Sequence, residues 1–360
     1  MTRVKYNFSA GPAVLPEEVL KEASQAVVDC GNTGLSILCM SHRGGAYEAL
    51  HMEALANVRD LLRVPPEFAV LFLQGGATQQ FSQVAMNLAG GKPADYTLTG
   101  QWADGAFKEA GKVATVRVAA DSRKVTPARV PLPSEIKVSA DAAYLHVTSN
   151  ETVDGIQWAA FPDSPVPLVC DMSSDIMSRD IPWDRFGLVY AGAQKNLGPA
   201  GVTVVIVRKD LAEKAPTRLP AMLRYQTHVE KDSMHNTPPC FSIYVLALVT
   251  RWVKAQGGVA AMETRNRAKA AKLYAAIDAS GYYKGTADKA HRSIMNVTYR
   301  LPTEELEKVF VKEAEAAGLS GLKGHRAVGG LRASIYNAMP PAGIDALVQF
   351  MADFQKRHSS

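Results

Sequence analysis

Cysteine is scarce in this sequence, with four among 360 residues. No two of them form a CxxC pair, and their positions show no metal-ligand spacing. The four are Cys30, Cys39, Cys170 and Cys240. Cysteines this few and this scattered are typical of reduced core thiols in an intracellular protein. We therefore expect neither a zinc site nor any other metal site.

Long hydrophobic runs are also missing. No uninterrupted apolar stretch approaches the ~20 residues that a helix needs to cross a bilayer. The segment at residues 1–16 lacks the apolar core of a signal peptide. These two absences predict a cytoplasmic protein that does not bind membranes.

Basic residues are not massed in any one run, although the formal net charge is +5. Nucleic-acid-binding proteins usually carry a basic patch or stripe, so nucleic acid is not an expected partner. The positive balance of charge suits small anionic ligands better.

The composition that remains is that of a globular protein, with 47% hydrophobic and 21% charged residues. A chain of this length can bury a large core and usually divides into domains. Alternating predicted strands and helices indicate an α/β fold with a mostly parallel central sheet. We expect an N-terminal arm at 1–15 that packs with the small domain, a large domain at 16–256 and a small α/β domain at 257–360.

Residues 188–207, LVYAGAQKNLGPAGVTVVIV, predict strand, loop and strand, because two apolar runs flank a polar turn. Lys195 lies at the mouth of the loop, and Gly198 and Gly201 let other groups approach closely. Desolvation at this position would lower the lysine pKa and give a neutral, nucleophilic amine. An imine-forming lysine fits this position, and an ordinary loop lysine is the alternative.

An aspartate ends another apolar run, LVCD, upstream of the lysine. Asp171 would lie at the carboxyl end of a buried strand, where open α/β sheets bind ligands. Its carboxylate could hold a protonated ring nitrogen, or it could cap a helix or form a turn. Pyridoxal phosphate chemistry requires both groups, because a lysine carries the cofactor and a carboxylate keeps its ring nitrogen positive.

Two more candidates follow predicted strands. Trp102 follows the strand at 96–99, and Thr152 follows the strand at 143–149. A lone tryptophan usually belongs to a core or an interface, and a threonine in a polar turn is common. However, Trp102, Thr152, Asp171 and Lys195 would all gather at one edge of a mostly parallel sheet. That convergence favours a ligand site.

A strand at 70–74, a glycine turn and a helix at 77–88 together predict an anion site. Free backbone N–H groups and the helix dipole converge at such a point. The turn, Gly75 and Gly76, fits neither Walker A nor GxGxxG, so nucleotide binding is the weaker interpretation.

A basic cluster occurs near the C-terminus, where His325, Arg326 and Arg332 surround two glycines. A solvated loop would explain three such residues. Arg332, however, opens an apolar strand and would be costly to bury without an anion. Recognition of a carboxylate by a bidentate arginine explains its position.

Several long motifs carry a family resemblance: SAGP, SHRGGAYE, NETVDGI, AGAQKNLGPAG, HNTPP and GHRAVGGLRASIYNAMP. They make the sequence similar, from about Phe8 to the last helix, to phosphoserine aminotransferases. These are class V pyridoxal-phosphate enzymes of the aspartate aminotransferase superfamily, with fold type I. The resemblance implies a homodimer with shared active sites. The implied reaction, a step of serine biosynthesis, is transamination of 3-phosphohydroxypyruvate with glutamate to phosphoserine and 2-oxoglutarate.

The resemblance also implies roles for single residues. Lys195 would carry pyridoxal 5′-phosphate as a Schiff base, Asp171 would pair with its ring nitrogen, and Trp102 would stack on its ring. The other implied cofactor contacts are Ala77, Thr78, Thr152, Gln194 and, from the second subunit, Asn236 and Thr237. The implied substrate contacts are Ser9, His42, Arg43, His325, Arg326 and Arg332.

In this family Arg332 would bind the α-carboxylate, while His325 and Arg326 would bind the phosphate. His42 and Arg43 would reach the phosphate across the dimer interface, although two exposed basic residues are the simpler interpretation. Some relatives carry arginine where this chain has Thr78, so we expect one phosphate contact to be missing.

Two other interpretations remain open. Another enzyme on the same scaffold, such as an alanine–glyoxylate-type aminotransferase or a cysteine desulfurase, would share Lys195 and Asp171 but lack the phosphate-binding histidine and arginines. A non-catalytic anion-binding protein would keep the basic clusters and form no imine.

Overall fold

A seven-stranded sheet forms the centre of the larger unit of the fold. The computed structural model describes residues 5–359 and orders these strands β2-β10-β9-β8-β5-β3-β4. Their bounds are β2 Phe68–Gln74, β3 Ala94–Leu98, β4 Val116–Asp121, β5 Leu145–Thr148, β8 Leu168–Asp171, β9 Phe186–Gly192 and β10 Val202–Arg208. Strand β10 runs antiparallel to β2 and β9, and the other recorded pairs are parallel. The predicted α/β fold with a mostly parallel sheet is confirmed.

Helices cover both faces of this sheet. Along β2, Phe68, Val70 and Phe72 belong to one hydrophobic core, whereas Leu71 and Leu73 belong to another. The first core includes residues of α1 Glu17–Val28, α2 Gly45–Leu61 and α7 Cys240–Ala255. The second includes residues of α3 Ala77–Leu88, α4 Gln101–Ala110, α5 Lys209–Glu213 and α6 Tyr225–Val229. Because both faces of the sheet are buried, the sequences of its strands are mostly continuous apolar runs.

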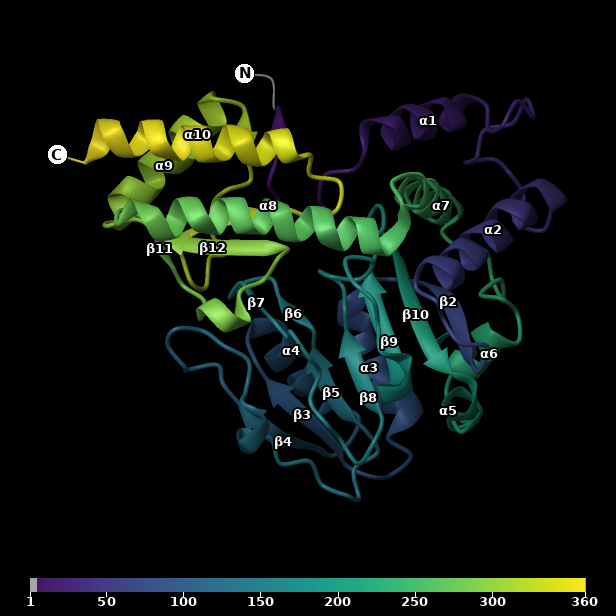
Figure 1. Cartoon of the computed structure of the whole chain (residues 1–360). Helices are drawn as coiled ribbons and strands as arrows, with labels where there is room; N and C mark the ends of the chain where they lie inside the picture. The colour runs from purple at the N-terminus through teal and green to yellow at the C-terminus, as the bar shows by residue number, and fades with distance from the viewer. Residues whose placement is uncertain (1–4, 360) are drawn as a thin grey trace.

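The smaller unit is built on a three-stranded antiparallel sheet. Its strands are β11 Lys284–Gly285, β12 Asn296–Arg300 and β14 Leu331–Ser334, and its helices are α8 Gly258–Ser280, α9 Glu304–Ala316 and α10 Pro341–His358. In Figure 1, α8 lies between α10 and the strands β11 and β12. Near the N-terminus, β1 Tyr6–Asn7 pairs in parallel with β13 Leu319–Ser320, and Phe8 belongs to the core of this unit.

Helix α8 contributes to the cores of both units. Val259 and Met262 pack in the core of the large sheet, whereas Leu273 and Ile277 pack in the core of the small unit. The proposed boundary at residue 257 therefore falls just before a helix that connects the two. The division into arm, large domain and small domain remains a prediction, and the pairing of β1 with β13 supports it for the arm.

Short elements complete the chain between the larger ones. A hairpin pairs β6 Asn150–Glu151 with β7 Ile156–Gln157, where the sequence predicts a turn. Four 3-10 helices span Pro133–Glu135, Trp183–Arg185, Ala221–Leu223 and Lys289–His291. Among residues 5–359, none of the helices combines the length and the hydrophobicity needed to span a bilayer.

Helix α4 is an element that the sequence pattern does not reveal, and it carries Trp102 in its first turn. Its buried residues are Ala103, Ala106 and Ala110, which have helical spacing but small side chains. Gly105 further weakens the helical pattern. A helix that buries only alanines gives little hydrophobic periodicity, so its sequence resembles a loop.

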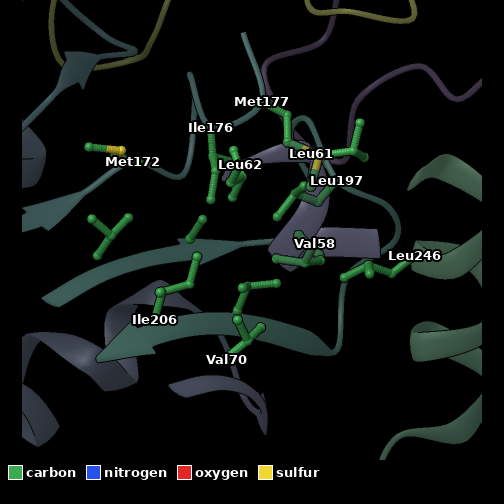
Figure 2. Close-up of a cluster of buried hydrophobic side chains, with 14 of the residues drawn as sticks. Val58, Leu61, Leu62, Val70, Met172, Ile176, Met177, Leu197, Ile206 and Leu246 are labelled. Atoms are coloured by element: carbon green, nitrogen blue, oxygen red, sulfur yellow. The ribbon is translucent and has the colours of Figure 1, made fainter. Parts of the chain in front are cut away.

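The core of the large unit supports the loop that carries Lys195. Leu197, two residues after this lysine, is fully buried. Figure 2 shows Leu197 among the side chains of α2 and β10 and beside Met177. The next residue, Gly198, lies close to α7, since a Cβ there would be 3.4 Å from Leu246 Cα. Packing against buried neighbours therefore fixes the position of the lysine loop.

Candidate active site

The four candidates that follow predicted strands lie at the carboxyl edge of the large sheet. Asp171 is the last residue of β8, and Lys195 follows β9. Trp102 lies in α4 directly after β3, and Thr152 lies in the β6–β7 turn after β5. Adjacent parallel strands deliver their following residues to one edge, so the topology brings these side chains together.

Lys195 contacts two of the other candidates. Its ammonium donates a hydrogen bond to Thr152 Oγ1 at 2.9 Å and lies 5.1 Å from the centroid of the Trp102 ring. Burial lowers the pKa of Lys195, while the carboxylates of Asp171 and Glu151 oppose that shift. A lowered pKa makes the neutral, nucleophilic amine more accessible near neutral pH.

The residue after the lysine ties its loop to the rest of the fold. Asn196 donates its side-chain amide to the Ile176 carbonyl at 2.6 Å and accepts the Asn337 N–H at 2.9 Å. Asn337 lies between β14 and α10, and its own side chain donates to the Met177 carbonyl at 2.9 Å. The lysine is therefore held between the two units of the fold.

Asp171 is a buried carboxylate supported by a neighbouring serine. Its Oδ1 accepts the Ser173 N–H at 2.9 Å and the Ser173 hydroxyl at 2.6 Å. Burial raises the pKa of Asp171, while the charge of Lys195 and the two bonds from Ser173 oppose the rise. A carboxylate held in this way has a fixed orientation and can stabilise a positive group beside it.

The N-terminus of α3 forms an open cradle beside the lysine loop. Its cap residue, Gly76, offers no side-chain acceptor. Among the described residues, the N–H groups of Ala77 and Thr78 have no acceptor either. At Gly192 a Cβ would lie 3.4 Å from the Ala77 nitrogen and 2.7 Å from Gln194 Oε1. The absence of a side chain at Gly192 therefore leaves space where backbone donors and the Gln194 amide converge.

The N-terminus of α4 is arranged differently, since protein carboxylates occupy it. Glu151 accepts the N–H groups of Trp102 at 3.1 Å and Ala103 at 2.9 Å, and the Asp154 carboxylate lies close to Gly100. Burial and the neighbouring carboxylate of Asp154 raise the pKa of Glu151 to about 7. This end of α4 is not free to bind an external anion.

Arg332 contacts the same threonine as the lysine does, and its charge acts on Lys195. Its Nη1 donates to the Thr152 carbonyl at 3.3 Å, and its Nε is buried without a partner. Burial lowers the pKa of the Arg332 guanidinium. Burial also lowers the pKa of His325, and the charges of Arg332 and Arg326 add to that effect. His325 and Arg332 line a cavity of about 170 Å³ together with Arg300, whereas Arg326 does not line it.

Ser9 belongs to the N-terminal arm, which lies along the lysine loop. Its N–H donates to Asn7 Oδ1 at 3.0 Å. Two residues later, Gly11 has φ +156°, and a Cβ there would be 3.4 Å from Lys195 Cγ. The Ala13 N–H donates to the Gln194 carbonyl at 2.8 Å. The arm therefore packs directly on the lysine.

Four predicted residues are not brought to this place within the chain. Among residues 5–359, no hydrogen bond or ion pair joins His42, Arg43, Asn236 or Thr237 to Lys195. Arg43 is exposed, and His42 Nε2 is buried without a partner. The Thr237 carbonyl accepts the Gln74 side-chain amide at 2.8 Å, which places this segment beside the strand that leads to α3.

Sequence reasoning missed several residues that shape the site, namely Gly11, Glu151, Asp154, Ser173 and Gly192. For Ser173 a signal exists, because it follows a strand-ending acid by two residues. The two carboxylates lie inside NETVDGI, which predicts a turn and says nothing of the helix that they contact.

Comparisons with known proteins agree with this architecture. Residues 5–347 match the family model for class-V aminotransferases. The chain is 54% identical to a phosphoserine aminotransferase of Niallia circulans over 359 residues, which is 99% of each protein.

Two solved structures are similar over nearly the whole chain. The phosphoserine aminotransferase of Bacillus circulans subsp. alkalophilus has a TM-score of 0.95 with 53% identity, and the alignment covers 99% of each chain. The PLP-bound phosphoserine aminotransferase of Trichomonas vaginalis has a TM-score of 0.94 with 40% identity, covering 97% of this chain and all of that one. The chain therefore belongs to the class-V aminotransferases, and within them to the phosphoserine aminotransferase family.

Proposed function

We propose that this protein is a pyridoxal-phosphate-dependent aminotransferase. In its reaction, glutamate would donate an amino group to 3-phosphohydroxypyruvate to give phosphoserine and 2-oxoglutarate. The observation that carries the proposal is the meeting of Lys195, Asp171, Thr152 and Trp102 at one edge of the large sheet. The family of the chain and its full-length relatives support the same activity.

The residues present fit pyridoxal phosphate. Two unpartnered N–H groups at the start of α3, with the space above Gly192, suit the phosphate. Asp171 suits the ring nitrogen because it is a buried carboxylate that lacks a cationic hydrogen-bond partner among the described residues. The indole of Trp102, whose Nε1 is buried and unpaired, offers a flat face to the ring. When bound, the cofactor supplies an electron sink for the carbanion at the substrate α-carbon.

The proposed roles of the side chains follow from their surroundings. Lys195, whose pKa is lowered by burial, would hold the cofactor and then move the proton that leaves the substrate α-carbon. Asp171 keeps a proton on the ring nitrogen, and Thr152 orients the lysine amine. Because one amino group is transferred in two half-reactions, ping-pong kinetics are expected.

Substrate anions would bind at Arg332, which contacts Thr152 as Lys195 does. Arg332 is poised for the α-carboxylate, because its buried Nε and remaining donors have no protein acceptor there. His325 and Arg326 would bind the phosphate, together with His42 and Arg43 from a second copy of the chain. Thr78 supplies no charge, so these residues must carry the recognition of phosphate.

A second copy is part of the proposal. Among the described residues, His42, Arg43, Asn236 and Thr237 make no hydrogen bond or ion pair with Lys195 or Asp171, so they would act in the site of the partner. Large apolar side chains exposed between residues 20 and 52 support an interface near His42: Leu20, Val27, Val28, Leu35, Leu38 and Met52. Exposed apolar groups gathered on one segment are typical of a surface that a partner covers.

Removing the lysine amine tests the proposed reaction. We expect Lys195→Ala to fold and to bind pyridoxal phosphate without a covalent bond, and to transaminate at least about 10⁴-fold more slowly because nucleophile and proton carrier are lost. The measurement is the rate of phosphoserine formation, together with borohydride trapping of the cofactor on the protein. Lys231→Ala, which removes an exposed lysine, is the control. Near wild-type turnover by Lys195→Ala would refute the proposal.

Mixed dimers test the sharing of active sites. Lys195→Ala and Arg43→Ala chains, each inactive alone, should regain activity when mixed, since one site of each mixed dimer is then intact. The activity of the mixture is compared with a tagged pull-down that measures subunit exchange. Exchange without recovered activity would show that Arg43 acts within its own chain.

A further inference from the structure

The first turn of α4 is held by a side chain that lies about fifty residues later in the chain. Its N-cap, Gly100, provides no side-chain acceptor. Instead, Trp102 and Ala103 donate to Glu151 at 3.1 and 2.9 Å. Two of the four amides that a helix N-terminus leaves unsatisfied are therefore bonded to one carboxylate of the β6–β7 hairpin.

The contact between the hairpin and α4 is tightly packed. Glu151 is 1% exposed, and it also accepts the Thr99 hydroxyl at 3.2 Å. A Cβ at Gly100 would lie 2.7 Å from Glu151 Cδ and closer still to Asp154 Oδ2. Residue 100 therefore has no room for a side chain, and the carboxylates approach the helix backbone directly.

This packing affects one active-site side chain above all. Trp102 is the second residue of α4, and its indole lies 5.1 Å from the Lys195 ammonium. The indole Nε1 is buried and makes no hydrogen bond, so no polar contact of its own fixes the ring. The orientation of the indole therefore depends on its packing against the core of α3 and α4 and on the backbone of the first helical turn, which Glu151 holds.

The same hairpin also contacts two other groups of the site. Thr152, between the two carboxylates in sequence, accepts from Lys195 through its hydroxyl and from Arg332 through its carbonyl. The hairpin is therefore in direct contact with the lysine, the arginine and the helix of the tryptophan.

We propose that Glu151 is a positioning residue for Trp102, and that it holds the indole over the Lys195 amine by capping α4. The inference rests on the proposed function only in the statement that the indole faces the cofactor ring. The capping itself is a property of the chain without cofactor. It can be tested without turnover.

Fluorine NMR of the cofactor-free protein labelled with 5-fluorotryptophan provides the test. The chain has four tryptophans, Trp102, Trp158, Trp183 and Trp252, and Trp102→Phe assigns the signal of interest. We expect Glu151→Ala to shift and broaden the Trp102 signal while leaving that of Trp183 unchanged, since its Nε1 donates to the Leu62 carbonyl at 2.7 Å. Glu151→Gln retains one acceptor oxygen, so it should shift the same signal less.

A matched control removes a cap elsewhere. Thr303 caps α9 by accepting the Leu306 N–H at 3.2 Å, so Thr303→Ala should lower stability without moving the Trp102 signal. In the loaded enzyme, Glu151→Ala should lower kcat/KM by about tenfold for glutamate and phosphoserine alike, because one misplaced ring serves both half-reactions. Thr303→Ala should leave both values near wild type.

Three outcomes would overturn the inference. The first is an unchanged Trp102 signal in Glu151→Ala. The second is a shift of all four tryptophan signals, which would show general support of the fold. If Glu151→Ala does not fold, Glu151→Gln decides, and an unmoved Trp102 signal in that variant also overturns the inference. A wild-type protein without transaminase activity would refute the proposed function but leave the NMR result standing.

Discussion

Helices α3 and α4 begin in similar ways and end up with opposite roles. Both follow a strand of the large sheet through glycine, and both bring their first turn to the candidate site. At α3 the N–H groups of Ala77 and Thr78 meet open space beside Gly192. At α4 the N–H groups of Trp102 and Ala103 are bonded to Glu151.

This difference shows that the groups facing a helix N-terminus decide whether its N–H groups can bind an external anion. An uncapped terminus keeps its donors and partial positive charge for an anion that arrives from outside. A terminus whose N–H groups are bonded to a carboxylate has no free donors for an external anion. Its first turn is held in place and can orient a side chain. Lys195 lies between the two, next to Gln194 on the α3 side and near Trp102 on the α4 side.

The largest expected effect distinguishes a buried carboxylate with a chemical role, Asp171, from one with a positioning role, Glu151. If the α4 terminus only orients the indole, Glu151→Ala should slow a half-reaction about tenfold. Asp171→Asn loses the charge that keeps the ring nitrogen protonated and should slow it about a thousandfold, or ~4 kcal/mol of barrier. Stopped-flow absorbance of the bound cofactor measures both rates.

If both variants lost the same factor in half-reaction rate, the distinction between a chemical role for Asp171 and a positioning role for Glu151 would be wrong. A decrease of less than about tenfold in Asp171→Asn, which is ~1.4 kcal/mol, would remove the ring-nitrogen role from Asp171. Cofactor content must be measured in each variant, so that weaker binding is not mistaken for slower chemistry.

The next effect concerns stability and pH at the α4 terminus. Burial, reinforced by Asp154, raises the pKa of Glu151 from 4.5 to about 7. The folded carboxyl therefore keeps its proton above the pH at which the unfolded one ionises. Its stabilising contribution is complete below about pH 4.5 and is lost as pH rises to about pH 7, and the loss is roughly 3 kcal/mol at ~1.4 kcal/mol per pH unit.

Urea unfolding of the cofactor-free protein across this range gives the measurement. Glu151→Gln cannot ionise, so its free energy of unfolding should fall less than that of the wild type as pH rises. Asp154, whose pKa is also raised by burial, remains in both proteins, and because its charge acts on Glu151 the difference between the two profiles reports the titration of the pair. Parallel pH profiles would show that Glu151 ionises in the folded state as readily as in the unfolded chain.

The sequence predicts the open terminus but not the occupied one, for a physical reason. The anion site at α3 arises from neighbours in the chain, a strand, Gly75 and Gly76, and a helix, so a local motif reveals it. The α4 cap joins residues 101–103 to the hairpin at 150–157. No local pattern can encode a contact across that separation. Because α4 buries alanines, the sequence does not predict the helix itself either.

The same division holds for the rest of the site. Lys195, Asp171, Thr152 and Trp102 follow strands, and the parallel order of those strands brings them together as predicted. Ser173, Gly11 and Gly192 matter through distances that only the folded chain defines. The dimer roles of residues such as Arg43 depend on a second chain and remain predictions.

The smallest expected effect tests the comparison by making α3 resemble α4. Thr78 is exposed at the second position of α3, so Thr78→Asp would place a carboxylate at the open N–H groups. This acid should raise the dissociation constant for pyridoxal phosphate about thirtyfold, or ~2 kcal/mol, because it repels the phosphate and takes its donors. The cofactor-free protein should become slightly more stable, by less than ~1 kcal/mol, since an acid favours a helix N-terminus.

Titration of the cofactor-free protein with pyridoxal phosphate, followed by tryptophan fluorescence, measures the affinity. Ser82→Asp is the matched control, because it adds the same charge one turn further along α3, away from the free N–H groups. It should weaken binding far less than Thr78→Asp. If both variants bind the cofactor as the wild type does, the phosphate does not bind at α3, and the open terminus has another use. If both weaken it equally, only long-range charge matters there, and the contrast between the two helices loses its functional meaning.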